Sequence, residues 1–262
     1  PGRSHAEFGP DGCVIRSSQP LPIRRATLTS MKGAFVSDGL LVPSASVVHD
    51  RIPIELFRGC TRGCRFCQAG MLYRPIRERP VEEIVDALLR WTEKTGWEEI
   101  GLVSLASCDY SGLEDVMERL KPMLEQKRVK LSLPSLRMDA FSVGLAAALE
   151  PVRRGGLTFA PEAGTQRLRN VINKGVSDED IESTLEAAFS RGWERIKLYF
   201  MMGLPTETRE DLEGIAKISE RAAVIGRKHK KRAEIAVSVA GFVPKPHTPF
   251  QWERQATVEE LS

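Results

Sequence analysis

No apolar run in this sequence approaches the roughly 18 residues that a membrane-spanning helix requires. A secretory signal pattern near the first residue is also missing. Four familiar catalytic patterns, H-E-x-x-H, G-x-x-x-x-G-K-S/T, G-x-S-x-G and G-x-G-x-x-G, do not occur either. We therefore expect a soluble, cytoplasmic protein with no membrane contact, whose chemistry is carried by some other motif.

The charge balance is nearly even and identifies no partner by itself. Lys and Arg together number 38, and Asp and Glu number 35, a difference of 3. The basic residues are scattered apart from the run at 227–232, which we interpret as a solvated helix end; contact with RNA or DNA phosphates is the alternative. With 262 residues, of which 42% are hydrophobic and 28% charged, the chain suits one globular domain.

Cysteine usage favours a metal site over disulfides. The five cysteines are an odd number, and three of them fall within eight residues. In a chain without a secretory signal, such a group indicates a reducing compartment. Because the sequence begins with Pro1 rather than Met, we expect it to be a piece of a longer protein.

Strand-like and helix-like segments alternate along most of the chain. We expect a linker or lead-in hairpin over 1–50, a core domain over 51–250 and the start of a C-terminal extension over 251–262. The expected strands lie at 54–57, 100–105, 129–133, 157–160, 195–200 and 234–240, with two short β-like runs at 25–29 and 40–42. The expected helices lie at 80–96, 139–149, 164–192 and 208–228, and one more helix is expected to begin at a capping box at 111–114. This order predicts an α/β fold with a parallel sheet: a partial six-unit barrel first, an open doubly wound sheet second. In either, the active site lies at the carboxyl ends of the strands.

Cys60, Cys64 and Cys67 have the spacing C-x3-C-x2-C just after the first core strand. Three thiolates leave one of the four irons of a cubane cluster without a protein ligand. Structural zinc is the alternative, but it needs four protein ligands, and Cys108 or His49 would have to be the fourth. A redox C-x-x-C pair alone would leave Cys60 unexplained.

With Phe66 in the aromatic position before the last cysteine, this motif resembles that of the radical S-adenosylmethionine (SAM) superfamily. The resemblance implies a partial (β/α)6 TIM-like barrel, a [4Fe-4S] cluster on the three cysteines, and SAM chelated to the open iron. It also implies that reduction cleaves SAM to methionine and a 5′-deoxyadenosyl radical, which abstracts a hydrogen atom. In such an enzyme the protein orients the cofactor and excludes water.

The same resemblance suggests further SAM-binding residues at later strand ends. Ser107 stands where the family binds the SAM amino group, with an ordinary turn as the alternative. Glu162, in a segment similar to that of the methylthiotransferase and cobalamin-dependent branches, is the candidate for the ribose hydroxyls, with a helix N-terminal charge as the alternative. Lys174 is a candidate for the SAM carboxylate or the substrate. Phe242 and Val243 are the candidates for adenine contact.

The segments 49–51, 65–71 and 73–79 resemble most an uncharacterised group of cobalamin-binding-domain radical SAM proteins. The D-x-H-x-x-G signature for cobalamin is absent from these residues, so cobalamin would enter only through a domain outside this chain. The first hypothesis is an enzyme that acts on an unknown substrate, with methyl or methylthio transfer to RNA or protein as one option. Such an enzyme would receive electrons from a donor such as flavodoxin or ferredoxin. The second is an iron-sulfur module that binds RNA or the ribosome without catalysis. Arg74, Arg77 and Arg79 either contact an anionic substrate or pair with neighbouring glutamates at the surface, and we favour the surface pairing.

Overall fold

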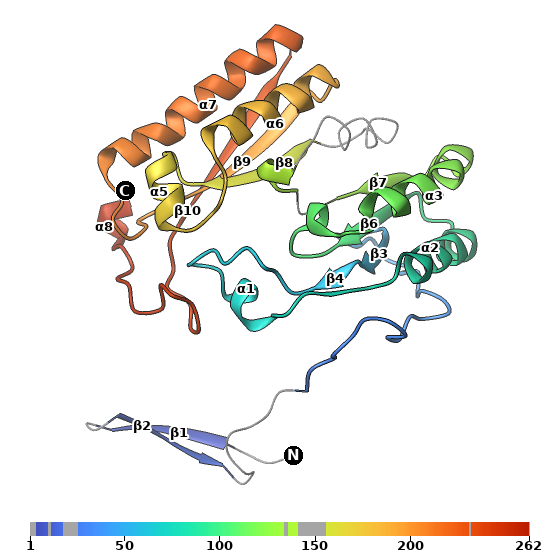
Figure 1. Cartoon of the computed structure of the whole chain (residues 1–262), viewed down its shortest axis with the longest axis horizontal. Helices are drawn as coiled ribbons and strands as arrows, with labels where there is room; N and C mark the ends of the chain where they lie inside the picture. The colour runs from blue at the N-terminus through green and yellow to red at the C-terminus, as the bar shows by residue number, and fades with distance from the viewer. Residues whose placement is uncertain are drawn as a thin grey trace.

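Two three-stranded parallel sheets form the body of the molecule (Figure 1). The computed structural model describes residues 4–9, 12–17, 26–133, 136–140, 156–230 and 232–261. The first sheet has the order β3-β6-β7, and the second has the order β8-β9-β10. Their bounds are β3 Ile52–Glu55, β6 Glu99–Val103, β7 Lys130–Ser132, β8 Leu157–Glu162, β9 Arg195–Met202 and β10 Glu234–Gly241. All six strands were expected, and within the described residues they follow one another in chain order, as in the predicted partial TIM-like barrel.

Helices connect consecutive parallel strands on one side of each sheet. The longer ones are α2 Val81–Thr95, α3 Leu113–Lys127, α6 Asp178–Ser190 and α7 Arg209–His229. Shorter ones are α1 Gln68–Leu72, η1 Ser107–Asp109, η2 Met138–Ala140, α5 Gln166–Val171 and α8 Val258–Leu261. The helix expected at 139–149 falls mostly on residues outside the described part of the chain. No helix among the described residues is long and apolar enough to cross a membrane.

The helices bury the faces on which their apolar residues recur. In α3, Leu113, Val116 and Leu120 all lie in the core, as their spacing requires. The capping box expected at the start of this helix is wrong. Its N-cap is Gly112, which has no side chain, and the backbone N–H of Ser111 instead donates to Glu78 Oε1 over 2.9 Å.

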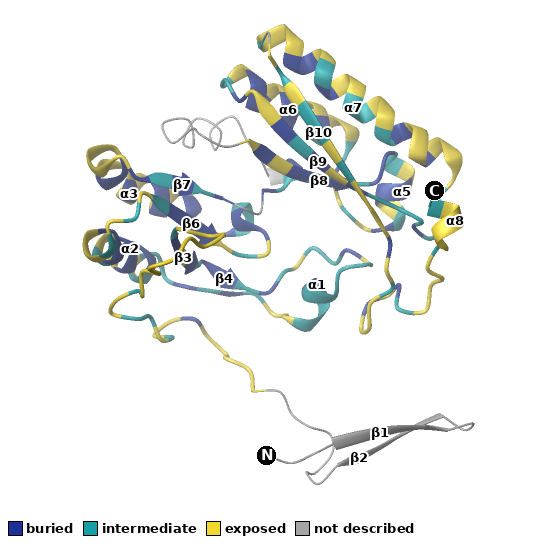
Figure 2. Cartoon of the chain, turned by 180° about the vertical axis from the view of Figure 1, so that it is seen from behind, coloured by how far each residue is buried: buried dark blue, intermediate teal, exposed yellow. Residues whose placement is uncertain are grey.

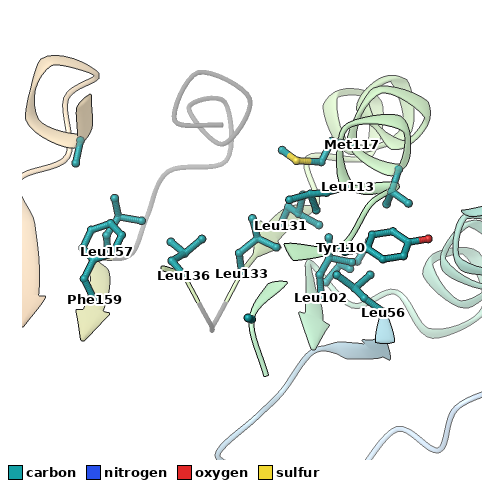
Figure 3. Packing of buried hydrophobic residues seen from close by; sticks show 14 of the residues in the cluster. Leu56, Leu102, Tyr110, Leu113, Met117, Leu131, Leu133, Leu136, Leu157 and Phe159 are labelled. Carbon is teal, nitrogen blue, oxygen red and sulfur yellow. The ribbon is translucent and has the colours of Figure 1, made fainter. Parts of the chain in front are cut away.

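One hydrophobic cluster spans both sheets. Leu131 and Leu133 at the end of the first half meet Leu157 and Phe159 of the second half through Leu136 (Figure 3). Within the described residues β7 and β8 are not joined by strand hydrogen bonds, so this packing holds the two halves together. A second, smaller cluster lies beyond the carboxyl ends of the second sheet and consists of Ala163, Leu168, Ile172, Leu204, Phe242 and Phe250.

The lead-in segment is a hairpin followed by an irregular stretch. Strands β1 (Ser4–Gly9) and β2 (Gly12–Ser17) pair antiparallel, so a hairpin is present. The two β-like runs expected at 25–29 and 40–42 are wrong, because residues 26–29 and 40–42 form no strand. Figure 2 shows residues 26–50 to be largely exposed.

Part of this stretch is nevertheless fixed to the core. Met31 is only 1% exposed, and the indole Nε1 of Trp91 on α2 donates to the carbonyl oxygen of Ser37 over 2.9 Å. Residues 26–39 therefore dock on α2 rather than forming a free linker.

Candidate functional site

A short antiparallel ribbon encloses the three-cysteine loop. Strands β4 (Phe57–Arg58) and β5 (Arg77–Glu78) pair with each other, so the chain between them leaves and returns at one point. Gly59 has a φ of 104°, a backbone conformation that glycine adopts readily and other residues rarely adopt. A Cβ at this position would also lie only 2.6 Å from the carbonyl oxygen of Tyr73. The loop is therefore held tightly at its base, at the carboxyl end of the first sheet.

Cys67 caps helix α1, and Cys64 lies in the turn just before it. Cys67 is the N-cap residue, and its sulfur accepts a hydrogen bond from the backbone N–H of Gly70 over 3.4 Å. Cys64 is 9% exposed, and its carbonyl oxygen accepts from the Cys67 N–H over 3.1 Å. Burial raises the pKa of the Cys64 thiol. Lys174 and Arg137 act in the opposite direction, whereas Cys67 and Cys60 raise it further. The two cations therefore favour the thiolate form of Cys64, against the effect of burial.

The donor set fits an iron-sulfur cluster. In a cubane, each thiolate binds a different iron, so the sulfurs need not converge on one point. Among the described residues, no group of three or more His, Cys, Asp or Glu side chains is close enough to hold a single metal ion. All three thiols are free, on one loop, and one of them already accepts a backbone N–H, a contact that tunes cluster sulfurs.

The turn after α5 supports the loop from the other side. The Arg65 N–H donates to the Ile172 carbonyl over 2.9 Å, and the Asn173 side-chain amide donates to the Gly63 carbonyl, also over 2.9 Å. The carbonyl oxygen of Arg65 accepts from the Phe250 N–H over 3.2 Å. The cysteine loop therefore lies between segments that follow β8 and β10.

Glu162 and Lys174 are brought together. Lys174 Nζ lies 3.1 Å from Glu162 Oε1, and both side chains are mostly buried. A register shift between Phe159 and Glu162 interrupts the pairing of β8 with β9, and Glu162 has a positive φ of 71°. Bulges commonly re-aim a side chain next to an active site, and a positive φ on a non-glycine residue is a feature of such places.

Ser107 lies in η1 beyond the end of β6 and is fully buried. Its hydroxyl donates to the Leu102 carbonyl over 3.0 Å and lies 2.9 Å from the hydroxyl of Ser104. The hydroxyl therefore has internal partners in Leu102 and Ser104.

Of the predicted aromatic and apolar contacts, Phe242 belongs to the smaller cluster and Phe66 packs against it, whereas Val243 does not. Phe242 is 2% exposed and packs edge-to-face on Phe250, with ring centroids 5.9 Å apart. Phe66 is partly buried against the same cluster, and Val243 is 48% exposed. The cluster thus connects the cysteine loop to the end of β10.

A chain of ion pairs beside the cysteine loop was not predicted from the sequence. Arg62 Nε donates to Asp109 over 2.9 Å, and Arg62 also pairs with Asp139 over 2.9 Å. Arg137 Nε donates to the other oxygen of Asp139 over 2.9 Å. The only sequence signal is that Asp109 and Asp139 are charged residues shortly after strands.

The preferred interpretation of Arg77 and Arg79 as surface residues is wrong. They are 8% and 7% exposed, and both donate mainly to backbone carbonyls. Arg77 reaches the Leu28 carbonyl and Arg79 the Ala34 carbonyl, so they hold the lead-in segment on the core. Only Arg79 has one of the expected glutamate partners, Glu83, at 3.3 Å.

Comparison with known proteins agrees with this architecture. The model of the radical SAM superfamily matches residues 54–218. An uncharacterized protein of Methanocaldococcus jannaschii is 34% identical over 200 residues, which are 76% of this chain and 42% of that protein. The ribosomal protein uS12 methylthiotransferase RimO of Treponema denticola is 24% identical over 187 residues, 60% of this chain and 39% of that protein. The radical SAM methyltransferase TsrM of Kitasatospora setae, solved with cobalamin and a [4Fe-4S] cluster, has a TM-score of 0.63 at 15% identity, over 95% of this chain and 49% of that one.

A three-cysteine loop at the carboxyl ends of parallel strands defines the class of protein, a partial α/β barrel suited to an iron-sulfur cluster and a ligand beside it. The chain belongs to the radical SAM superfamily, a family of enzymes that use a [4Fe-4S] cluster and SAM. It spans less than half the length of the curated relatives described above.

Proposed function

We propose that this chain is the catalytic core of a radical SAM enzyme that acts on a substrate still to be identified. The observation that carries the proposal is the three-cysteine loop, which contacts through Gly63 and Asn173 the turn that carries Lys174, the partner of Glu162. When bound, the cluster and SAM supply reductive cleavage of the sulfonium and the 5′-deoxyadenosyl radical. We propose residues 51–250 as the core domain and 251–262 as the start of a C-terminal extension.

The protein's own residues then have distinct roles. Cys60, Cys64 and Cys67 hold the cluster, and Phe66 packs behind the loop. Glu162 accepts hydrogen bonds from the ribose hydroxyls, for which its buried carboxylate has the required lone pairs. Lys174 pairs with the SAM carboxylate. The backbone near Ser107 receives the amino group, and Phe242 and Val243 border the adenine.

The reaction and its partners are inferred from the names of relatives. A methylthiotransferase and a methyltransferase among them favour methyl or methylthio transfer, with RNA or a ribosomal protein as the substrate class. Enzymes of this family require a reductant, and we propose flavodoxin or ferredoxin in the cytoplasm, where the free thiols stay reduced. Cobalamin would be bound by a domain outside this chain.

The competing interpretation, an iron-sulfur module that binds RNA without catalysis, depends on basic surface residues. Arg77 and Arg79 are buried under the lead-in segment and contribute no such surface. These two residues therefore lend no support to the binding module.

Anaerobic reconstitution with iron and sulfide, followed by dithionite and SAM, tests the proposal. The wild-type chain is expected to form 5′-deoxyadenosine, and a variant with Cys60, Cys64 and Cys67 changed to alanine is not. A four-iron cluster that neither responds to SAM nor cleaves it would favour the binding module. Uptake of zinc alone would contradict both.

A further inference from the structure

Four charged side chains form a continuous chain along one side of the cysteine loop. In spatial order they are Asp109, Arg62, Asp139 and Arg137, joined by three ion pairs. Arg62 is in the cysteine loop itself, Asp109 follows β6, and the other two follow β7. The chain therefore joins three separate segments at the carboxyl ends of the first sheet.

Its geometry is more specific than that of ordinary surface pairs. Both carboxylate oxygens of Asp139 are used: Oδ1 by Arg137 Nε at 2.9 Å and Oδ2 by Arg62 at 2.9 Å. Asp109, Arg137 and Asp139 are 11%, 10% and 14% exposed. Arg62 is 34% exposed, but its three partners in the chain are mostly shielded from water, so salt screens these charges less than it screens fully exposed ones.

The chain also continues to the proposed SAM residues. A second nitrogen of Arg137 donates to the backbone carbonyl of Lys174 over 3.1 Å, and Lys174 in turn pairs with Glu162. Arg137 thus fixes the turn that carries Lys174, while its charge stays close to the loop.

Both cations are tied to the cysteine loop. Arg62 lies between Cys60 and Cys64 in that loop, and the turn to which Arg137 donates also contacts the loop, because the Asn173 side-chain amide donates to the Gly63 carbonyl. Asp109 and Asp139 come from outside the loop, beyond the ends of β6 and β7. A cluster held by three thiolates is anionic, and one-electron reduction adds a further negative charge, so nearby cations favour the reduced form.

We propose that Arg62 and Arg137, held in place by the shared carboxylate of Asp139, are positioning residues that raise the reduction potential of the cluster on Cys60, Cys64 and Cys67. This inference rests on the proposed function, because it requires the cluster. A merely structural role would affect stability and iron content but would not shift the potential in a charge-dependent way.

Two substitutions with opposite charge changes separate these roles. Arg137→Gln removes a cation near the thiols and is expected to shift the midpoint potential to a more negative value. Asp139→Asn removes a carboxylate and is expected to shift it to a more positive value. Arg137→Lys keeps the charge and should retain most of the wild-type potential. Arg119→Gln is the matched control, because Arg119 pairs with Glu82 between the outer helices.

The measurement is an EPR-monitored redox titration of each reconstituted chain without SAM, with iron content and thermal unfolding recorded in parallel. Opposite shifts for the two variants, with no shift for Arg119→Gln, would support the proposal. Shifts in the same direction, or an unchanged potential in both, would overturn it while leaving SAM cleavage by the wild type intact. Should Arg137→Gln fail to fold, Arg62→Gln takes its place with the same expected direction. Absence of any four-iron cluster from the wild type would instead contradict the proposed function itself.

Discussion

At the scale of single residues, Glu162 combines three uncommon properties. It follows a bulge, it has a positive φ, and its carboxylate is mostly buried against Lys174. A non-glycine residue in this conformation costs of order 1–3 kcal/mol unless its surroundings compensate. The surrounding structure, including the ion pair with Lys174, therefore holds Glu162 in a backbone conformation that it would not adopt by itself.

We predict that Glu162→Gln weakens SAM binding by about tenfold or more, because hydrogen bonds to a charged group contribute about 1.5 kcal/mol or more. Binding to the reconstituted chain can be measured by isothermal titration calorimetry. Glu182→Gln is the control, since Glu182 forms an exposed pair with Arg221 on the outer helices. Equal affinities for SAM in wild type and Glu162→Gln would remove Glu162 from the site.

Asp211 gives a prediction about acid stability. Burial acts to raise the pKa of this 1% exposed carboxyl, but hydrogen bonds from Thr165, Thr208 and Arg167 outweigh it and hold the pKa below the usual range of an aspartate. A depressed folded-state pKa stabilises the protein above the unfolded-state value of roughly 4, and the contribution is lost as the pH falls through the folded-state value. The melting temperature of Asp211→Asn should thus lie below that of the wild type at pH 7. The difference in melting temperature between wild type and variant should become smaller below about pH 4. A difference that stays constant with pH would show that the ionised carboxylate is not the source of the stabilisation.

Residue-level prediction from sequence succeeded where the signal is local. The cysteine spacing lies within eight residues and needs no tertiary information. The ion-pair chain of Arg62, Asp109, Asp139 and Arg137 joins three segments and has no periodicity, so only the fold reveals it. The hydroxyl of Ser107 illustrates a different limit, because its partner is the backbone carbonyl of Leu102.

At the scale of elements, the approach of α5 to α7 depends on glycine. A Cβ at Gly164, just before α5, would overlap the backbone oxygen of Asp211 and the backbone nitrogen of Ile215. Backbone atoms within a helix cannot easily move away. The start of α5 therefore packs directly on the main chain of α7.

Gly164→Ala is expected to lower the free energy of unfolding by about 2 kcal/mol or more, as overpacking against rigid neighbours does. Chemical denaturation gives this value. Gly39→Ala is the control, because a Cβ at that position has no neighbour within 4 Å. Similar losses of unfolding free energy in the two variants would show that the close contact between α5 and α7 does not contribute to stability.

Helices and strands were predicted correctly where apolar periodicity is strong. They were predicted less well where contacts from distant parts of the sequence decide the local structure. All six core strands and the buried faces of α2 and α3 follow from spacing. The capping box before α3 failed because Glu78, far away in sequence, takes the Ser111 N–H. The β-like runs at 26–29 and 40–42 failed because no partner strand lies beside them; contacts with the core hold residues 26–39 instead.

At the scale of the whole molecule, the buried Arg79 connects the lead-in segment to the barrel. Its guanidinium donates to the Ala34 and Glu55 carbonyls and pairs with Glu83. Removing it leaves two partly buried carbonyl groups without a donor, at a cost of about 1 kcal/mol or more. We predict that Arg79→Ala accelerates amide hydrogen exchange across 26–39. Arg119→Ala, at an exposed pair, should not, and equal exchange in both would contradict the docking role.

The proposed function requires that Cys60, Cys64 and Cys67 hold a four-iron cluster with one iron open to SAM. The EPR spectrum of the reduced, reconstituted chain with and without SAM tests this requirement. We expect a four-iron signal that changes when SAM is added and that is absent when the three cysteines are replaced by alanine. A four-iron signal indifferent to SAM, or a chain that binds only zinc, would contradict it.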